Sequence, residues 1–204
     1  MPLRLTMSLW QPELNSSSIH LAVEGSCGGS SLGIQLSRQV ISNGGRVLWA
    51  APELPDSTRF SQIFHDMPLT SSSKFHAMNL VGAFEQSVDA LLNAANMLPG
   101  VELVVLDDYC PDNGRIPKDI ISRLNQFISD SKWTTLLISK GGISMEKKDS
   151  NMENVSITAR GKNDLNTDQV WLLTRPESDS QRVLWIDDKP VKLRLIEEGF
   201  VNPD

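Results

Sequence analysis

Short apolar runs along the chain alternate with segments in which apolar residues recur at helical spacing. The apolar runs predict strands at 18–24, 46–51, 101–108 and 133–139. The helical spacing predicts helices over 32–45, 79–98 and 116–130. The unbroken run at 101–108 is typical of a central strand that is buried on both faces. This order of elements predicts an α/β fold with a mostly parallel central sheet flanked by helices.

The second half of the chain has a different pattern. Residues 140–168 are polar and poor in aliphatic side chains, which predicts a long polar loop. Apolar residues return at 169–174 and 182–187, two strands that a short turn joins as a hairpin. Apolar and basic residues then alternate in 191–199, the period of a half-buried strand. The sheet is therefore expected to end in antiparallel strands.

Length and composition limit the class of protein. The chain of 204 residues fits one domain, 1–204, in which 1–17 is a lead-in to the first strand. A net charge of −6 argues against a domain that coats nucleic acid by bulk charge. Two cysteines are too few for a disulfide framework, and no stretch has the apolar length of a signal peptide or a membrane span. We expect a soluble, cytoplasmic protein, nuclear if its source is eukaryotic.

A glycine cluster, GSCGGSS at 25–31, separates the first strand from the first helix. Backbone N–H groups and a helix N-terminus point at an anion from such a turn. The phosphate-loop pattern G-x-x-x-x-G-K-[ST], aligned on Gly29, places Ser30 at the lysine position and Glu24 at the first glycine. The candidate nucleotide-binding residues are Gly25, Gly28, Gly29, Ser30, Ser31 and Asp107. The alternative is a glycine-rich turn without a ligand, which the absence of the lysine charge favours. The spacing of the glycines does not match the dinucleotide-binding pattern G-x-G-x-x-G.

Carboxylates follow two of the predicted strands. Asp107 and Asp108 end the run at 101–108, where an aspartate could hold magnesium together with the Ser31 hydroxyl; the alternative is that they begin a loop. Glu53 follows the strand at 46–51 and could polarise a water, although without further support it is a turn residue.

Basic residues occur along the polar loop. They are Lys140, Lys147, Lys148, Arg160 and Lys162, and five acidic residues accompany them. This balance favours a solvated loop, with ordering on DNA as the alternative. The five tryptophans fall mostly in predicted strands, which favours core or interface positions. The three histidines have no metal-ligand spacing with either cysteine.

These segments, in this order, resemble the core of the RecA/RadA recombinases and their paralogues. VEGSCGGSSLGIQLSRQV resembles the Walker A turn and its helix, and VELVVLDDY resembles Walker B with Asp107 as its aspartate. RVLWAAPELPDSTRF resembles the strand that ends in the catalytic glutamate, here Glu53, and TTLLISKGG resembles the strand with a polar switch residue, here Ser139–Lys140. The ending LRLIEEGF is close to the closing sequence of that family.

The resemblance covers roughly residues 18–200 and implies a RecA-like P-loop core like that of a short RadB-like paralogue with a degenerate Walker A motif. It implies a partner in homologous recombination or DNA repair that docks on a recombinase or another paralogue, with single-stranded DNA as a further contact and no membrane. Because the lysine is missing, no cofactor is expected, although Mg-ATP is the open alternative. The rival functions are a weak Mg-ATP-dependent ATPase and a RecA-like scaffold subunit of an assembly without DNA.

Overall fold

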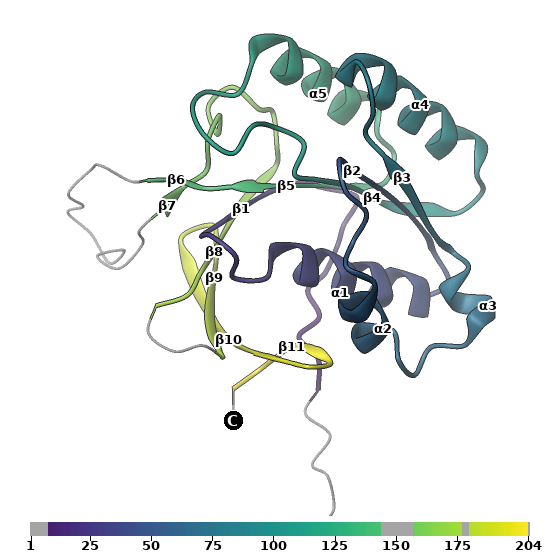
Figure 1. Ribbon diagram of the computed structural model, residues 1–204, viewed down its shortest axis with the longest axis vertical. Coiled ribbons are helices and arrows are strands. Elements are labelled where there is room, and N and C mark those ends of the chain that lie inside the picture. The colour runs from purple at the N-terminus through teal and green to yellow at the C-terminus, as the bar shows by residue number, and fades with distance from the viewer. Residues whose placement is uncertain (1–7, 144–156, 177–179, 204) are drawn as a thin grey trace, which may run out of the picture.

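The structure is a computed structural model that describes residues 8–143, 157–176 and 180–203. Figure 1 shows the elements in chain order. The helices are α1 (Gly29–Ser42), α2 (Ser57–Ile63), α3 (Leu69–Ser72), α4 (Phe84–Met97) and α5 (Lys118–Asp130). The strands are β1 (Ser18–Val23), β2 (Arg46–Ala51), β3 (Phe75–Asn79), β4 (Val101–Asp107), β5 (Thr134–Lys140), β6 (Gly142–Ile143), β7 (Ile157–Thr158), β8 (Gln169–Thr174), β9 (Gln181–Ile186), β10 (Lys189–Ile196) and β11 (Gly199–Val201).

Nine of these strands form one sheet in the order β11-β10-β9-β8-β1-β5-β4-β2-β3. The pairs from β3 to β8 are parallel, and β8, β9, β10 and β11 pair antiparallel. β4 lies between β5 and β2 and is buried along most of its length. The predicted α/β class, the mostly parallel sheet and the antiparallel ending are confirmed.

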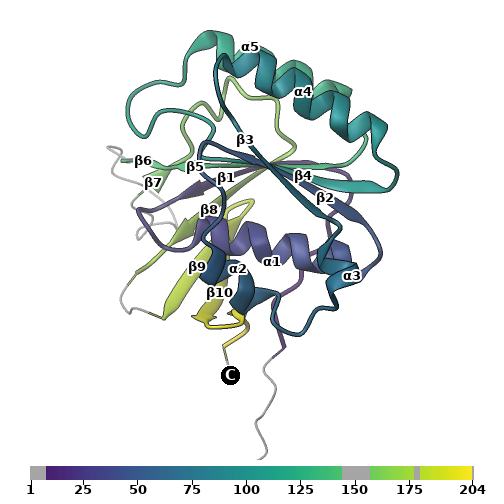
Figure 2. The ribbon, with the colours of Figure 1, turned by 45° about the vertical axis from the view of Figure 1, so that its right-hand side comes forward.

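Helices cover both faces of the sheet (Figures 1 and 2). α4 and α5 pack on one face through a cluster that includes Leu91, Leu106 and Phe127. On the other face α1 lies in the concavity made by the parallel strands and the antiparallel strands β8–β11, and its core includes Trp171 and Phe200. This packing fixes the N-terminus of α1 at the ends of the central strands, where parallel sheets bind their ligands.

Several elements differ from the sequence-based prediction. The segment at 79–98 begins as the edge strand β3 and a turn, and the helix begins only at Phe84. α1 begins at Gly29, inside the glycine cluster. The short helices α2 and α3 lie in a stretch for which the apolar pattern predicts no element. The polar loop at 140–168 contains the two-stranded β6–β7 pair at its described ends, and its centre lies outside the described residues.

The described part of the N-terminal lead-in pairs with the last strand. Leu9 bridges Val201, and the Trp10 N–H donates to the Phe200 carbonyl over 2.9 Å. The Gln35 amide of α1 donates to the carbonyls of both Trp10 and Phe200, at 2.7 and 3.0 Å. These contacts cover the β11 edge, whereas the opposite edge, β3, pairs only with β2 among the described residues.

Candidate functional site

A cavity of about 510 Å³ opens at the C-terminal ends of the central strands. Its walls come from the ends of β1, β2, β4 and β5 and from the first turn of α1. The candidate residues that line it are Gly25, Gly28, Gly29, Ser30, Ser31, Glu53, Asp107 and Lys140. The fold thus brings together side chains from four separate stretches of the sequence, including both expected carboxylates.

The glycine cluster forms the turn into α1. Gly28 is the N-cap residue, with a φ of 107° that only glycine adopts without strain. Cys27 anchors the turn, because its thiol donates to the Leu173 carbonyl and its own carbonyl accepts a bond from the buried Arg182 Nε at 2.7 Å. The first intrahelical bond runs from the Leu32 N–H to the Gly28 carbonyl, so the N–H groups of Gly29, Ser30 and Ser31 lie in the first turn, where an α-helix offers no backbone acceptor. The turn therefore has the form of a phosphate loop.

A serine–aspartate contact lies at the base of the cavity. The Ser30 hydroxyl donates to Asp107 Oδ2 over 2.7 Å. In a phosphate loop the hydroxyl residue and the Walker B aspartate both serve the magnesium ion, so the hydroxyl residue lies beside that aspartate. The alignment on Gly29 assigned this hydroxyl to Ser31, whereas the residue beside Asp107 is Ser30. The pattern therefore fits the structure when it is shifted by one residue, to 23–30.

Asp107 is buried and carries a perturbed carboxyl group. Only 9% of the residue is exposed. Burial raises its pKa to about 6, the bond from Ser30 opposes that shift, and the neighbouring Asp108 adds to it. A carboxyl with a raised pKa in a cavity is typical of functional sites.

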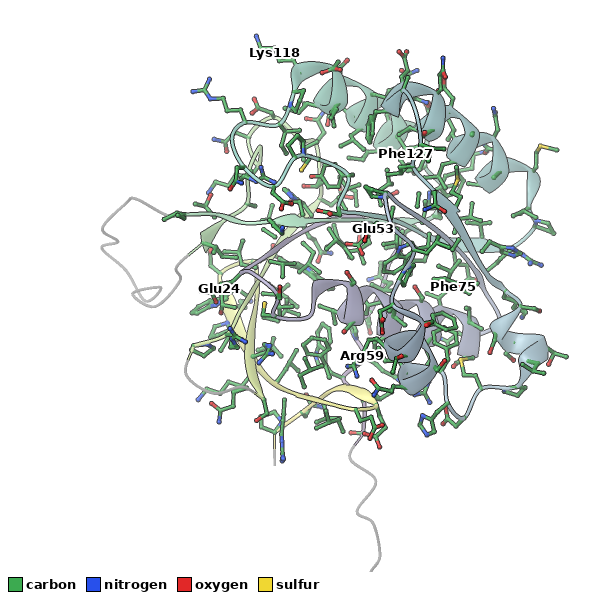
Figure 3. The ribbon with its side chains drawn as sticks, in the orientation of Figure 1. Glu24, Glu53, Arg59, Phe75, Lys118 and Phe127 are labelled. Atoms are coloured by element: carbon green, nitrogen blue, oxygen red, sulfur yellow. The ribbon has the colours of Figure 1, made fainter. Side chains whose placement is uncertain are left out.

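Arg59 of α2 joins three parts of the molecule at the cavity wall. Its Nε donates to Ser31 Oγ over 2.9 Å, and its other nitrogens donate to the carbonyls of Ile196 and Glu197 at 3.2 and 2.6 Å. Figure 3 labels Arg59 and Glu53, which belong to the segment that follows β2. Glu53 is exposed and lines the cavity. The Arg59 contacts tie the first turn of α1 to the β10–β11 turn.

We expect Arg59→Met to lower the free energy of unfolding by about 1 kcal/mol, because the Ser31 hydroxyl and the partly exposed carbonyls of Ile196 and Glu197 lose a common donor that water replaces only in part. Urea unfolding measures the loss. Arg59→Lys is the matched control: it keeps the charge but cannot reach all of these acceptors, so it should restore only part of the stability. Full restoration by lysine would show that charge alone matters at this position.

The Glu24 carboxylate is bound at the end of β8. Its Oε2 accepts the N–H of Arg175 over 2.7 Å, at the end of β8, and it is not among the residues that line the cavity. Its carboxylate therefore supports the sheet. Glu24, which the alignment on Gly29 places at the first glycine of the pattern, is thus bound to the sheet and does not line the cavity.

The basic residues of the polar loop have separate positions. Lys140 lines the cavity and forms an ion pair with Asp112. Arg160 donates to the carbonyls of Lys140 and Gly114 at 2.9 and 3.2 Å, so it fastens β7 to the loop that follows β4. Lys162 is exposed, and Lys147 and Lys148 lie outside the described residues. A role for these residues in DNA binding remains a prediction.

A buried polar cluster that the sequence did not suggest adjoins the cavity. Ser139 lines the cavity, and its hydroxyl lies 3.0 Å from His20 Nε2, which also lies 3.3 Å from the Tyr109 hydroxyl. Burial, with a contribution from Arg160, lowers the pKa of His20 to about 4, so the ring is neutral at physiological pH. Histidine spacing gives no signal for such a contact, because the three residues come from β1, the loop after β4, and β5.

No protein-family profile and no curated protein matches the sequence. Solved structures do match the fold. A RadB recombinase aligns with a TM-score of 0.69 and 14% identity over 93% of this chain and 91% of its own. A DnaB-like replicative helicase, solved in a study of its interactions with primase, aligns with a TM-score of 0.66 and 13% identity over 93% of this chain. A third solved structure, an ATPase domain, aligns with a TM-score of 0.66 and 12% identity over 94% of this chain.

The fold is that of the RecA-like ATPases. At these identities the similarity establishes architecture and not activity. The chain spans 58% of the length of the helicase, 91% of the RadB recombinase and 86% of the third structure, the ATPase domain. Among the described residues, none of the helices has the length and apolar character needed to cross a bilayer.

Proteins with a RecA-like fold bind Mg-ATP, and the cavity has residues that suit the magnesium ion but few that suit the phosphates. Ser30 and Asp107 are a suitable hydroxyl and carboxylate for the magnesium side. The phosphate side has two cations in the lining, Arg59 and Lys140, and both have partners already. The lining therefore suits the magnesium side of Mg-ATP better than its phosphate side.

Proposed function

We propose that this protein is a recombinase paralogue that assists homologous recombination or DNA repair by docking on a recombinase or another paralogue of the same fold, with little or no dependence on nucleotide. The observation that supports this function best is the match to a RadB recombinase, which extends over nearly the full length of both chains. The helicase match leaves much of the helicase uncovered. The incomplete phosphate site supports a docking role over a catalytic one.

The β3 edge is the surface that fits such docking. The register with β2 directs the backbone N–H and C=O groups of Phe75, Ala77 and Asn79 away from the sheet. Two large apolar side chains on either side of β3 in the sequence are exposed: Leu69 by 88% and Val81 by 72%. A strand from a partner can extend a sheet at such an edge. The tryptophans do not supply the surface, since Trp49, Trp133, Trp171 and Trp185 are buried and Trp10 is half-buried.

Proline at Ala77 tests the docking edge. The Ala77 N–H points outward, so Ala77→Pro removes a donor to a partner strand without breaking a bond to β2. In a pull-down from native cell extract, we expect the parent protein to recover a recombinase and the variant to recover about tenfold less or none. Ala77→Thr keeps the N–H and should bind normally.

The thermal midpoints of both Ala77 variants should stay close to that of the parent protein, which separates lost docking from lost folding. Equal recovery by all three proteins would rule out the β3 edge. Recovery of machinery unrelated to recombination would overturn the proposed function in favour of a RecA-like scaffold.

A weak ATPase is the second candidate, because Ser30, Asp107 and Glu53 line one cavity and Ser30 contacts Asp107. A thermal-shift titration distinguishes the two. A rise of the midpoint with Mg-ATP that Asp107→Ala abolishes would favour the ATPase. The absence of a shift at millimolar nucleotide would favour the docking function.

A further inference from the structure

The Ser30–Asp107 contact sets the register of the phosphate-loop pattern at residues 23–30. In that register Gly28 takes the second glycine and Ser30 takes the hydroxyl position. The two positions that depart from the pattern are Val23, where the first glycine belongs, and Gly29, where the lysine belongs. In this register the lysine position holds Gly29 and not a serine, and the first glycine position holds the β-branched Val23.

The Val23 side chain leaves no room for a residue larger than glycine at position 29. A Cβ atom at Gly29 would lie 2.6 Å from Val23 Cγ2 and 3.2 Å from Ile138 Cγ2. Carbon atoms pack at about 3.5–4.0 Å, so the shorter distance is a clash. Val23 cannot withdraw easily, because it is 6% exposed and its strand pairs on both sides with β5 and β8. A β-branched side chain also has few alternative rotamers.

We propose that Val23 and Gly29 are a matched pair of specificity-determining residues that closes this loop to a lysine, and with it to tight binding of nucleotide phosphates. The valine fills the volume that a glycine leaves open in the phosphate-loop pattern, and the glycine at position 29 is the residue that tolerates it. The inference rests on identifying 23–30 as a degenerate phosphate loop, but it does not depend on docking at β3.

The charged residues that line the cavity also disfavour the binding of nucleotide phosphates. Glu53, Asp56, Asp107 and Asp108 all line it. Of the two cations, Arg59 donates to Ser31 and to backbone carbonyls, and Lys140 pairs with Asp112. Without a lysine at position 29, a triphosphate would meet more carboxylates than available cations, so its charge would be poorly compensated.

Four proteins test the pair: the parent, Val23→Gly, Gly29→Lys, and the variant with both substitutions. Calorimetric titration with Mg-ATP should give no measurable binding for the parent and for either single variant. The double variant should bind, with a Kd at least about tenfold below the detection limit set by the others. Gly29→Lys alone should lower the thermal midpoint by about 5 °C or more, and much less when Val23 is glycine.

A second cycle uses smaller changes, in case a lysine variant fails to fold. Gly29→Ala should lower the midpoint in the parent and have a smaller effect when Val23→Ala is present. Tight Mg-ATP binding by the parent, binding by Gly29→Lys alone, or additive effects in the alanine cycle would each overturn the proposal. The pull-down with the Ala77 variants reports on docking alone, so the failure of either proposal can be recognised separately.

Discussion

Asp107→Asn should stabilise the protein at about pH 8, by about 2–3 kcal/mol in the free energy of unfolding. Burial raises the pKa of Asp107 from 3.8 to about 6 in the folded protein. Between these values the unfolded chain releases the proton first, so the contribution of Asp107 to stability falls as the pH rises from about 4 to about 6 and stays low above that. Asparagine cannot ionise and therefore avoids this cost, while its amide oxygen can still accept the Ser30 hydroxyl.

Urea unfolding at a series of pH values measures this effect. The difference between variant and parent should vanish near pH 4 and reach its full size above pH 6. Asp108→Asn is the matched comparison: it changes the adjacent, exposed aspartate, whose φ of 54° asparagine also tolerates. It should keep most of the slope and reduce it slightly, because the charge of Asp108 is a smaller cause of the raised pKa of Asp107. A destabilised Asp107→Asn protein at pH 8 would contradict a raised pKa at this site.

Such a gain would also bear on function. A carboxylate kept in a buried position at a cost to stability is typical of a site selected for chemistry and not for folding. Asp107 carries this cost although the glycine-rich loop beside it has no lysine. The cavity therefore combines a carboxylate that suits magnesium with a loop that offers no cation of its own.

The strands of the sheet were predictable from sequence because their apolar runs are long and buried. The edge strand β3 was not: its residues are only partly buried, so FHAMN has neither an apolar run nor a clear alternation. Leu80 stands at helical spacing from Phe84, which extended the predicted helix too far. Half-exposed edges leave little pattern in a sequence, and propensity does not replace it.

The sequence named several residues that line the cavity, but it did not determine the register of the motif. Adjacent glycines at 28 and 29 and adjacent serines at 30 and 31 allow two alignments of the same motif. Only the contact between Ser30 and Asp107, which are 77 residues apart in the sequence, distinguishes them. The conflict between Val23 and Gly29 is likewise a three-dimensional fact, since neither residue alone departs from the usual composition of a strand or a turn.

His20→Gln is expected to make the protein more stable than the parent in acid, because it removes the unfavourable contribution of the histidine. Burial, followed by the charge of Arg160, lowers the pKa of His20 from 6.5 to about 4. As the pH falls through this range, the unfolded chain takes up a proton that the folded protein cannot accept, so stability is lost between about pH 6.5 and 4. The full size of this loss is about 3 kcal/mol. Glutamine cannot be charged and can still hydrogen-bond Ser139.

Asp107 and His20 oppose each other in nearly the same pH range, because acid favours the folded state through the aspartate and disfavours it through the histidine. The parent should therefore have a nearly flat stability profile between about pH 4 and 6.5, apart from a small slope from His76, whose pKa burial also lowers. Asp107→Asn should lose stability toward acid, His20→Gln should gain it, and the protein with both changes should again be flat. His65→Gln, at an exposed histidine, is the control. Parallel profiles for the two single variants would show that these groups do not determine the acid response, because opposite slopes follow directly from the opposite charges of their ionised forms.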